Sequence, residues 1–151
     1  MSTTSGKLRL QILEARLTRD TEMFGKMDPF VVIETRMQKL RTKTQQDAGK
    51  TPTWADEVAD IDVKYVGDDM HLTVYDEEAV TDHDVVGSAT MKLSTFCVDK
   101  GIDEWYEIFY EAKSAGHIRI KSKWVSGKDE LQQMPKEMPK QAPSFTFTDG
   151  S

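Results

Sequence analysis

The sequence predicts an all-β fold, an antiparallel sandwich or barrel built from about eight short strands. Apolar and polar residues alternate with a period of two along most of the chain, and turn residues separate these runs. No segment shows a strong helical period. A chain of 151 residues with 38% hydrophobic residues is also the size of one domain with one core.

Each predicted strand places apolar side chains at alternate positions, so that one face is buried and the other is wet. In the first strand, Leu8, Leu10 and Ile12 alternate with polar or charged neighbours. Alternation or short apolar runs predict strands at residues 7–12, 29–35, 38–45, 59–65, 70–75, 88–93, 105–110 and 118–124. Eight strands in about 120 residues are typical of an antiparallel sandwich.

The composition changes after residue 125. Three of the five prolines, Pro135, Pro139 and Pro143, follow at intervals of four and interrupt any helix. We therefore expect a folded domain over residues 1–125 and a mostly disordered tail over residues 126–151. Phe145 and Phe147 in the tail either touch the domain loosely or form a docking motif.

Composition excludes several function classes. A net charge of −6, from 20 Lys+Arg against 26 Asp+Glu, argues against a nucleic-acid binder. The single cysteine, Cys97, excludes an internal disulfide and a multi-cysteine metal site. No run approaches the roughly 18 apolar residues of a membrane span, and the first residues lack an apolar signal region. We expect a cytoplasmic, soluble protein whose membrane contacts are peripheral.

The sequence does not point to an enzyme. It lacks G-x-S-x-G, a glycine-rich phosphate loop and H-E-x-x-H. The three histidines, His71, His83 and His117, are far apart in the chain. Cys97 lies in an apolar stretch, where a buried inert thiol is more common than a catalytic dyad.

Acidic residues gather in two segments between strands. Residues 76–84 hold five carboxylates in nine residues with no Lys or Arg, and residues 19–28 hold Asp20, Glu22 and Asp28. Two negative charges about 5 Å apart repel by roughly 1 kcal/mol in water and roughly 3 kcal/mol at an effective dielectric of about 20. Either the segments spread into solvent, or they meet and bind a cation. Oxygen ligands suit calcium better than zinc or copper, although the spacing does not fit an EF-hand.

Five motifs in order resemble those of the C2 domain, a β-sandwich that binds calcium and phospholipid. They are A-R-L at 15–17, G-K-M-D-P-F-V at 25–31, T-P-T-W at 51–54, L-T-V-Y-D at 72–76 and D-V-V-G at 84–87. The resemblance covers about residues 6–125 and is strongest to short single-domain C2 proteins such as the plant elicitor-responsive type, which share M-D-P. It implies an eight-stranded C2-type sandwich. The strand order implied is the permuted type II, with both termini opposite the acidic loops.

The resemblance also implies a set of calcium ligands. The family's five acidic positions match Glu22, Asp28, Asp76, Glu78 and Asp84, and the separations agree. Glu22 and Glu78 stand where the family usually has Asp. The cofactor implied is therefore Ca²⁺, bound by a set in which two ligands are one methylene longer than usual.

Two further groups of residues fit a membrane partner. Met23 and Phe24 in the first acidic segment and Val80 in the second are apolar, and they could enter a bilayer or, for Phe24, pack back on the domain. Lys39, Arg41 and Lys43 alternate onto one face of a strand. By resemblance this face binds phosphoinositides; alternatively its charges only protect an edge strand from pairing.

The sequence thus predicts a non-catalytic module that docks on anionic membranes, carrying phosphatidylserine or phosphoinositide, when calcium rises. The alternative is a calcium-insensitive C2 scaffold that binds a protein, through the sandwich face or the tail. The oligomeric state is left open.

Overall fold

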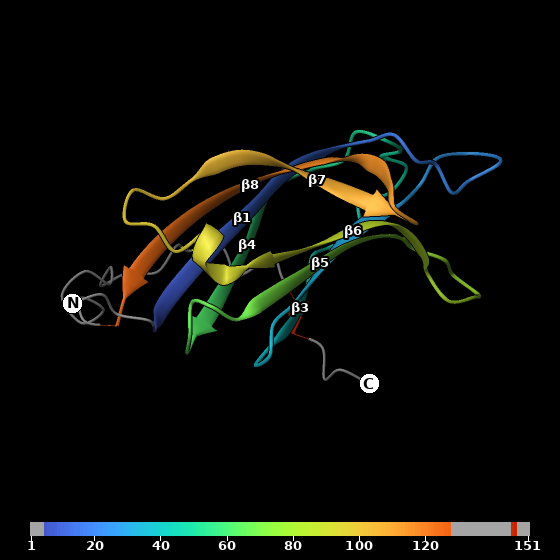
Figure 1. Cartoon of the computed structure of the whole chain (residues 1–151). Helices are drawn as coiled ribbons and strands as arrows, with labels where there is room; N and C mark the ends of the chain where they lie inside the picture. The colour runs from blue at the N-terminus through green and yellow to red at the C-terminus, as the bar shows by residue number, and fades with distance from the viewer. Residues whose placement is uncertain (1–4, 128–145, 148–151) are drawn as a thin grey trace.

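The protein, described from a computed structural model, consists of two facing β-layers (Figure 1). The structure describes residues 5–127 and 146–147. One layer has the strand order β4-β1-β8-β7, and the other has the order β6-β5-β2-β3. The layers touch along one edge through a single β6–β7 pair, Ser88 with Phe109. The predicted eight-stranded antiparallel sandwich is therefore confirmed.

The strands of the first layer are β1 (Gly6–Leu17), β4 (Thr53–Val63), β7 (Asp103–Tyr110) and β8 (Lys113–Ser126). Those of the second are β2 (Pro29–Glu34), β3 (Lys39–Arg41), β5 (Asp69–Asp76) and β6 (Asp84–Lys92). One 3₁₀ turn, η1 (Leu93–Thr95), follows β6. A two-residue strand, β9 (Thr146–Phe147), pairs with β3. Among the described residues, no helix is long and apolar enough to cross a membrane.

The alternating residues that predicted the strands build the core between the layers. Leu10 and Ile12 of β1 and Ile120 of β8 face Ile33 of β2 and Leu72 of β5, and all five are at most 1% exposed. Their polar neighbours lie outside. Burying side chains of this size contributes about 1.5–3 kcal/mol each, so the period-two pattern supplies the main driving force for the fold.

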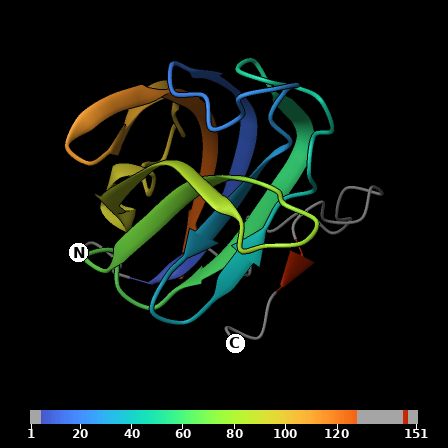
Figure 2. The ribbon, with the colours of Figure 1, turned by 90° about the vertical axis from the view of Figure 1, so that its right-hand side faces the viewer.

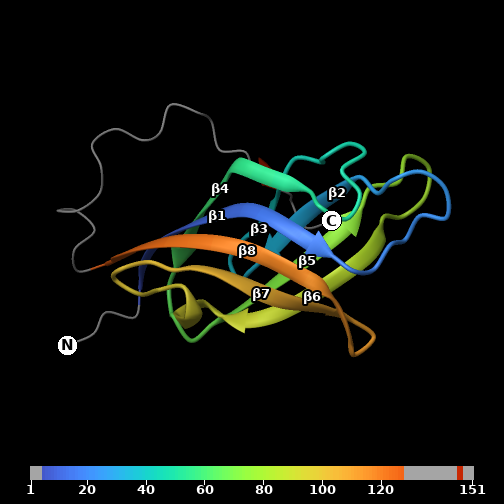
Figure 3. The ribbon, with the colours of Figure 1, turned by 90° about the horizontal axis from the view of Figure 1, so that it is seen from above.

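The strand order is the permuted one that the resemblance implied. β1 lies between β4 and β8, and Gly6 at its start pairs with Ser126 at the end of β8. The chain therefore enters the sandwich where β8 leaves it, at the end opposite the acidic loops (Figure 3).

Three loops crowd the other end, which Figure 2 views head-on. We call them the first loop (residues 18–28), the second loop (42–52) and the third loop (77–83). The register explains why they meet: Pro29 pairs with Asp76, and Asp76 pairs with Asp84. Antiparallel neighbours that stop at the same row of the sheet place their connecting loops side by side.

Most of the predicted tail lies outside the described residues, so its disorder stays a prediction. β9 is the exception. Its pairing of Phe147 with Leu40 and of Thr146 with Arg41 covers the outer edge of β3, so Phe147 does touch the domain. Phe145 lies outside the described residues.

Candidate metal centre

Backbone-to-backbone hydrogen bonds connect the three loops to one another. The amide of Glu77 in the third loop donates to the carbonyl of Asp28 in the first loop at 2.9 Å. The second loop is bonded to the same stretch, since Gln45 N donates to Pro29 O at 2.9 Å and Gly49 N to Met27 O at 3.0 Å. Met27 itself is fully buried in the core. The loop end is therefore a connected framework.

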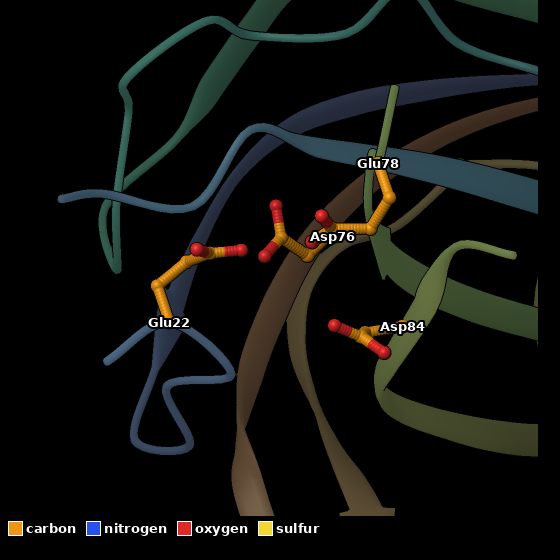
Figure 4. A group of neighbouring side chains, drawn as sticks. All are labelled: Glu22, Asp76, Glu78 and Asp84. Carbon is orange, nitrogen blue, oxygen red and sulfur yellow. The ribbon is translucent and has the colours of Figure 1, made fainter. Parts of the chain in front are cut away.

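Four carboxylates converge within this framework. Glu22, Asp76, Glu78 and Asp84 each contribute one oxygen to a group whose members all lie within 4.8 Å of one another. Figure 4 shows Glu22 approaching from the first loop, and the other three coming from the end of β5, the third loop and the start of β6. The acidic segments that the sequence singled out, separated by more than 50 positions, do meet in space.

Asp76 is the anchor of the group. It ends β5, is 1% exposed, and both of its carboxylate oxygens accept hydrogen bonds. Oδ1 accepts from the amide of Asp28 at 2.8 Å, and Oδ2 accepts from the hydroxyl of Thr21 at 2.7 Å. Each oxygen keeps a further lone pair, so the residue is held in place and still able to bind a cation. The sequence did not predict the part played by Thr21.

The electrostatics of Glu22 reflect the crowding. Hydrogen bonding to Asp76 and Glu78, together with repulsion from their charges, raises the pKa of Glu22 to about 8. A carboxyl group that holds a proton near neutral pH relieves a concentration of negative charge. A cation placed among the four oxygens would relieve it in the same way.

Oxygen separations fit calcium. Ca²⁺ binds oxygens at about 2.3–2.6 Å, so two ligands on opposite sides of one ion lie about 5 Å apart. The four oxygens meet this limit. The longer side chains of Glu22 and Glu78 do not prevent the four oxygens from converging.

Asp28, the fifth predicted ligand, is placed differently. Its carboxylate is not part of the converging group; Oδ1 accepts a hydrogen bond from the amide of Asp47 at 2.6 Å. Asp47 has a φ of 54°, the left-handed backbone conformation that is uncommon for residues other than glycine. Asp28 thus links two loops in this structure, and its ligation stays a prediction. Asp20, another carboxylate of the first acidic segment, accepts a hydrogen bond from the amide of Glu22 at 2.9 Å and so shapes the first loop.

The apolar residues of the acidic loops project into solvent. Met23 is 90% exposed, Phe24 is 85% exposed and Val80 is 93% exposed. Phe24 does not pack back on the domain, so that alternative is wrong. Large apolar side chains at such exposure are costly in water unless a partner covers them.

The three predicted basic residues have different surroundings. Lys39 and Arg41 lie on β3, whereas Lys43 follows the strand and is exposed. Within residues 5–127, no carboxylate forms a salt bridge with Lys39 or Lys43. Arg41 is engaged: its Nη2 donates to Glu77 Oε1 at 2.6 Å, and its guanidinium lies 3.7 Å from the centre of the Phe30 ring. Hydrogen bonds from Thr44 and Arg41 lower the pKa of Glu77.

Cys97 is half-buried, and burial raises the pKa of its thiol to about 12. The thiolate is the reactive form of cysteine, so this environment disfavours a nucleophilic role near neutral pH.

Comparison with known proteins agrees with the fold. The family model of the C2 domain matches residues 6–108. The chain belongs to the C2 domain family. This C2 domain is 26% identical over 125 residues to human extended synaptotagmin-3, covering 80% of the chain but 14% of that protein. It is 25% identical over 116 residues to elicitor-responsive protein 3 of Oryza sativa subsp. japonica, covering 76% of the chain and 80% of the relative.

Among solved structures, this C2 domain superposes on the two-domain fragment of extended synaptotagmin 2 in its calcium-bound form. The TM-score is 0.70 at 21% identity, with 83% of this chain and 48% of that one covered. At this identity the likeness shows the fold. The human and mouse extended synaptotagmin-3 proteins are far longer than this chain, which spans 14% of their length.

Proposed function

We propose that this C2 domain is a calcium-dependent phospholipid-binding module that docks on anionic membranes through its first and third loops. The observation that carries the proposal is the convergence of Glu22, Asp76, Glu78 and Asp84 within 4.8 Å. The calcium-bound C2 domains of extended synaptotagmin 2, a structural neighbour, support the choice of metal. Calcium would supply positive charge at the loop tips and would bridge the carboxylates to lipid phosphate.

The chain's own residues prepare this end for the membrane. In the absence of a cation, the acidic loops are repelled by an anionic surface. Once that charge is balanced, Met23, Phe24 and Val80 are the most exposed apolar groups at the loop end. Moving apolar area into the interface contributes about 25 cal/mol per Å². Neutralisation of the acidic loops by calcium therefore determines when the domain binds the membrane, and insertion of the apolar side chains increases the affinity.

The basic residues add a second contact with anionic lipid. Lys39 and Lys43 offer ammonium groups, each contributing about 1 kcal/mol near an anionic surface. Arg41, predicted alongside them, is already held by Glu77 and Phe30 and is less free to reach a lipid headgroup. We propose recruitment from the cytoplasm to phosphatidylserine- or phosphoinositide-containing membranes when calcium rises.

Sedimentation with phosphatidylserine vesicles tests the proposal. We expect the full chain to pellet in calcium and to stay in solution in excess chelator. Asp76→Asn and Asp84→Asn each remove one charge from the converging group and should abolish most of the calcium-dependent binding. Asp69→Asn is the matched control, because Asp69 starts the strand that Asp76 ends and pairs with Lys92.

A variant of the loop tip, Phe24→Ala, distinguishes the contribution of calcium binding from that of membrane insertion. Phe24→Ala should leave calcium affinity unchanged and weaken vesicle binding by about tenfold or more, since a buried Phe contributes about 1.5–3 kcal/mol. Equal pelleting in calcium and chelator would contradict calcium dependence. No pelleting in either condition would favour the alternative, a calcium-insensitive scaffold that binds a protein partner.

A further inference from the structure

The third loop has two functional sides. The predicted ligands in and beside this loop, Asp76, Glu78 and Asp84, each directly follow a residue that contacts the outer face of the second layer. Tyr75 stacks on Phe30 with ring centres 5.2 Å apart. His83 meets the same ring edge-on at 5.0 Å, and its Nδ1 accepts a hydrogen bond from the amide of Glu78 at 2.9 Å.

Glu77 completes this outer side, and Arg41 holds it. The Arg41 Nη2 donates to Glu77 Oε1 at 2.6 Å and to the hydroxyl of Thr44 at 3.1 Å. That hydroxyl in turn donates to the same carboxylate oxygen at 2.8 Å. With its guanidinium stacked 3.7 Å above Phe30, Arg41 is fixed on three sides.

We propose that Arg41 is a positioning residue for the calcium site: it fixes Glu77, and with it the backbone that presents Asp76 and Glu78. The inference deepens the proposed function and rests on it for the identity of the metal. It assigns Arg41 a role different from that of Lys39, its neighbour on the same face of β3, which forms no salt bridge within residues 5–127 of the structure.

The two possible roles of Arg41, as a nearby charge or as a positioning residue, predict opposite changes in calcium affinity for Arg41→Ala. Arg41 is a cation near a cation site, so its removal should tighten calcium binding if only its charge matters. If Arg41 positions the loop, Arg41→Ala should instead weaken calcium binding, because the ligands must be ordered at the moment of binding. Outer residues that orient metal ligands typically cost about tenfold or more when removed.

Calorimetric titration of the full chain with calcium, without lipid, distinguishes the two. We expect Arg41→Ala to weaken binding by about tenfold, and Arg41→Lys, which keeps the charge but loses the planar fork, to weaken it less. Lys39→Ala, the matched control, removes the same charge and should leave binding unchanged or slightly tighter. Tighter binding by Arg41→Ala, or an effect equal to that of Lys39→Ala, would overturn the proposal.

Amide hydrogen exchange in chelator gives a readout independent of the metal. The amides of Glu77 and Glu78 are hydrogen-bonded to Asp28 O and His83 Nδ1, so they should exchange faster in Arg41→Ala, while amides of β1 keep their protection. Unchanged exchange of the Glu77 and Glu78 amides in Arg41→Ala would count against a positioning role. If the β1 amides also lost protection, the whole domain would be destabilised, and the same comparison would be made with Arg41→Lys. If the wild type binds no calcium, the proposed function fails, and the exchange comparison alone decides whether Arg41 orders the loop.

Discussion

Glu57 is a buried acidic residue that lies on strand β4 of the sandwich and not in the acidic loops. The residue is 4% exposed, and its Oε1 accepts a hydrogen bond from the amide of Lys43 at 2.5 Å. Burial is the main cause that raises the pKa of Glu57 above its ordinary value. A carboxyl with a raised pKa in the native state favours folding while it is protonated, and this benefit is lost as pH rises through the native pKa.

Glu57→Gln should therefore stabilise the domain at neutral pH. Glutamine keeps the acceptor for Lys43 N and removes the buried charge. We expect the variant to have the higher melting temperature at about pH 7.5. The difference should shrink as pH falls and vanish near about pH 3, below the ordinary pKa of glutamate, where Glu57 is neutral in both states. Thermal unfolding across this range measures it. A variant less stable than the wild type at every pH would show that the charge itself is needed for packing.

Among the secondary-structure elements, the β7–β8 hairpin has a strained turn that a single substitution should relieve. Tyr110 and Lys113 pair directly, and the two residues between them, Glu111 and Ala112, have φ values of 50° and 65°. Two positive φ angles in a two-residue connection are typical of a type I′ turn, whose second residue is usually glycine. Alanine in this conformation costs about 1–2 kcal/mol.

Ala112→Gly should consequently increase the free energy of unfolding by about 1 kcal/mol, as measured by denaturant titration. Ala55→Gly supplies the control of opposite sign, because Ala55 is an exposed residue inside β4, where glycine costs about 0.5–1 kcal/mol. A loss of stability in Ala112→Gly would mean that the hairpin is held by contacts of the alanine methyl group.

For the whole molecule, folding itself creates the repulsion at the loop end. The unfolded chain disperses carboxylates that the sandwich gathers within 4.8 Å, so the native state loses stability there and calcium should restore it. A ligand at about 100 times its dissociation constant stabilises by about 2.7 kcal/mol. We expect the melting temperature to rise with calcium by a corresponding amount.

Asp84→Asn should separate the two effects. Asp84 is exposed, so its neutralisation should raise the melting temperature in chelator, by relieving repulsion, and remove most of the calcium-induced rise. Asp69→Asn should keep the full calcium response. Scanning calorimetry of the three proteins in chelator and in calcium measures both quantities. A variant that retains the wild-type calcium response would exclude Asp84 from the site.

Much of this architecture was predictable from local patterns. Alternation at Leu8, Leu10 and Ile12 identifies β1 because a strand with one buried face must repeat every two residues. The acidic segments were recognisable from composition, and the resemblance to the C2 family pointed within them to Glu22, Asp76, Glu78 and Asp84. Phe24 and Val80 were recognisable as loop-tip residues. Each of these features depends on a few consecutive residues, so their composition and spacing are enough to predict it.

The tertiary structure alone decided which of these groups face one another. Asp28 fits the ligand spacing, yet its carboxylate accepts the amide of Asp47, a residue 19 positions away whose amide direction depends on the fold of the second loop. Arg41 fits a basic face, yet it binds Glu77, 36 positions away. The sequence by itself determined the strands, the acidic loops and their chemical character, because each depends on neighbours in the chain. The partner of each side chain depends on strand register and loop packing, and these exist only once the two layers have closed.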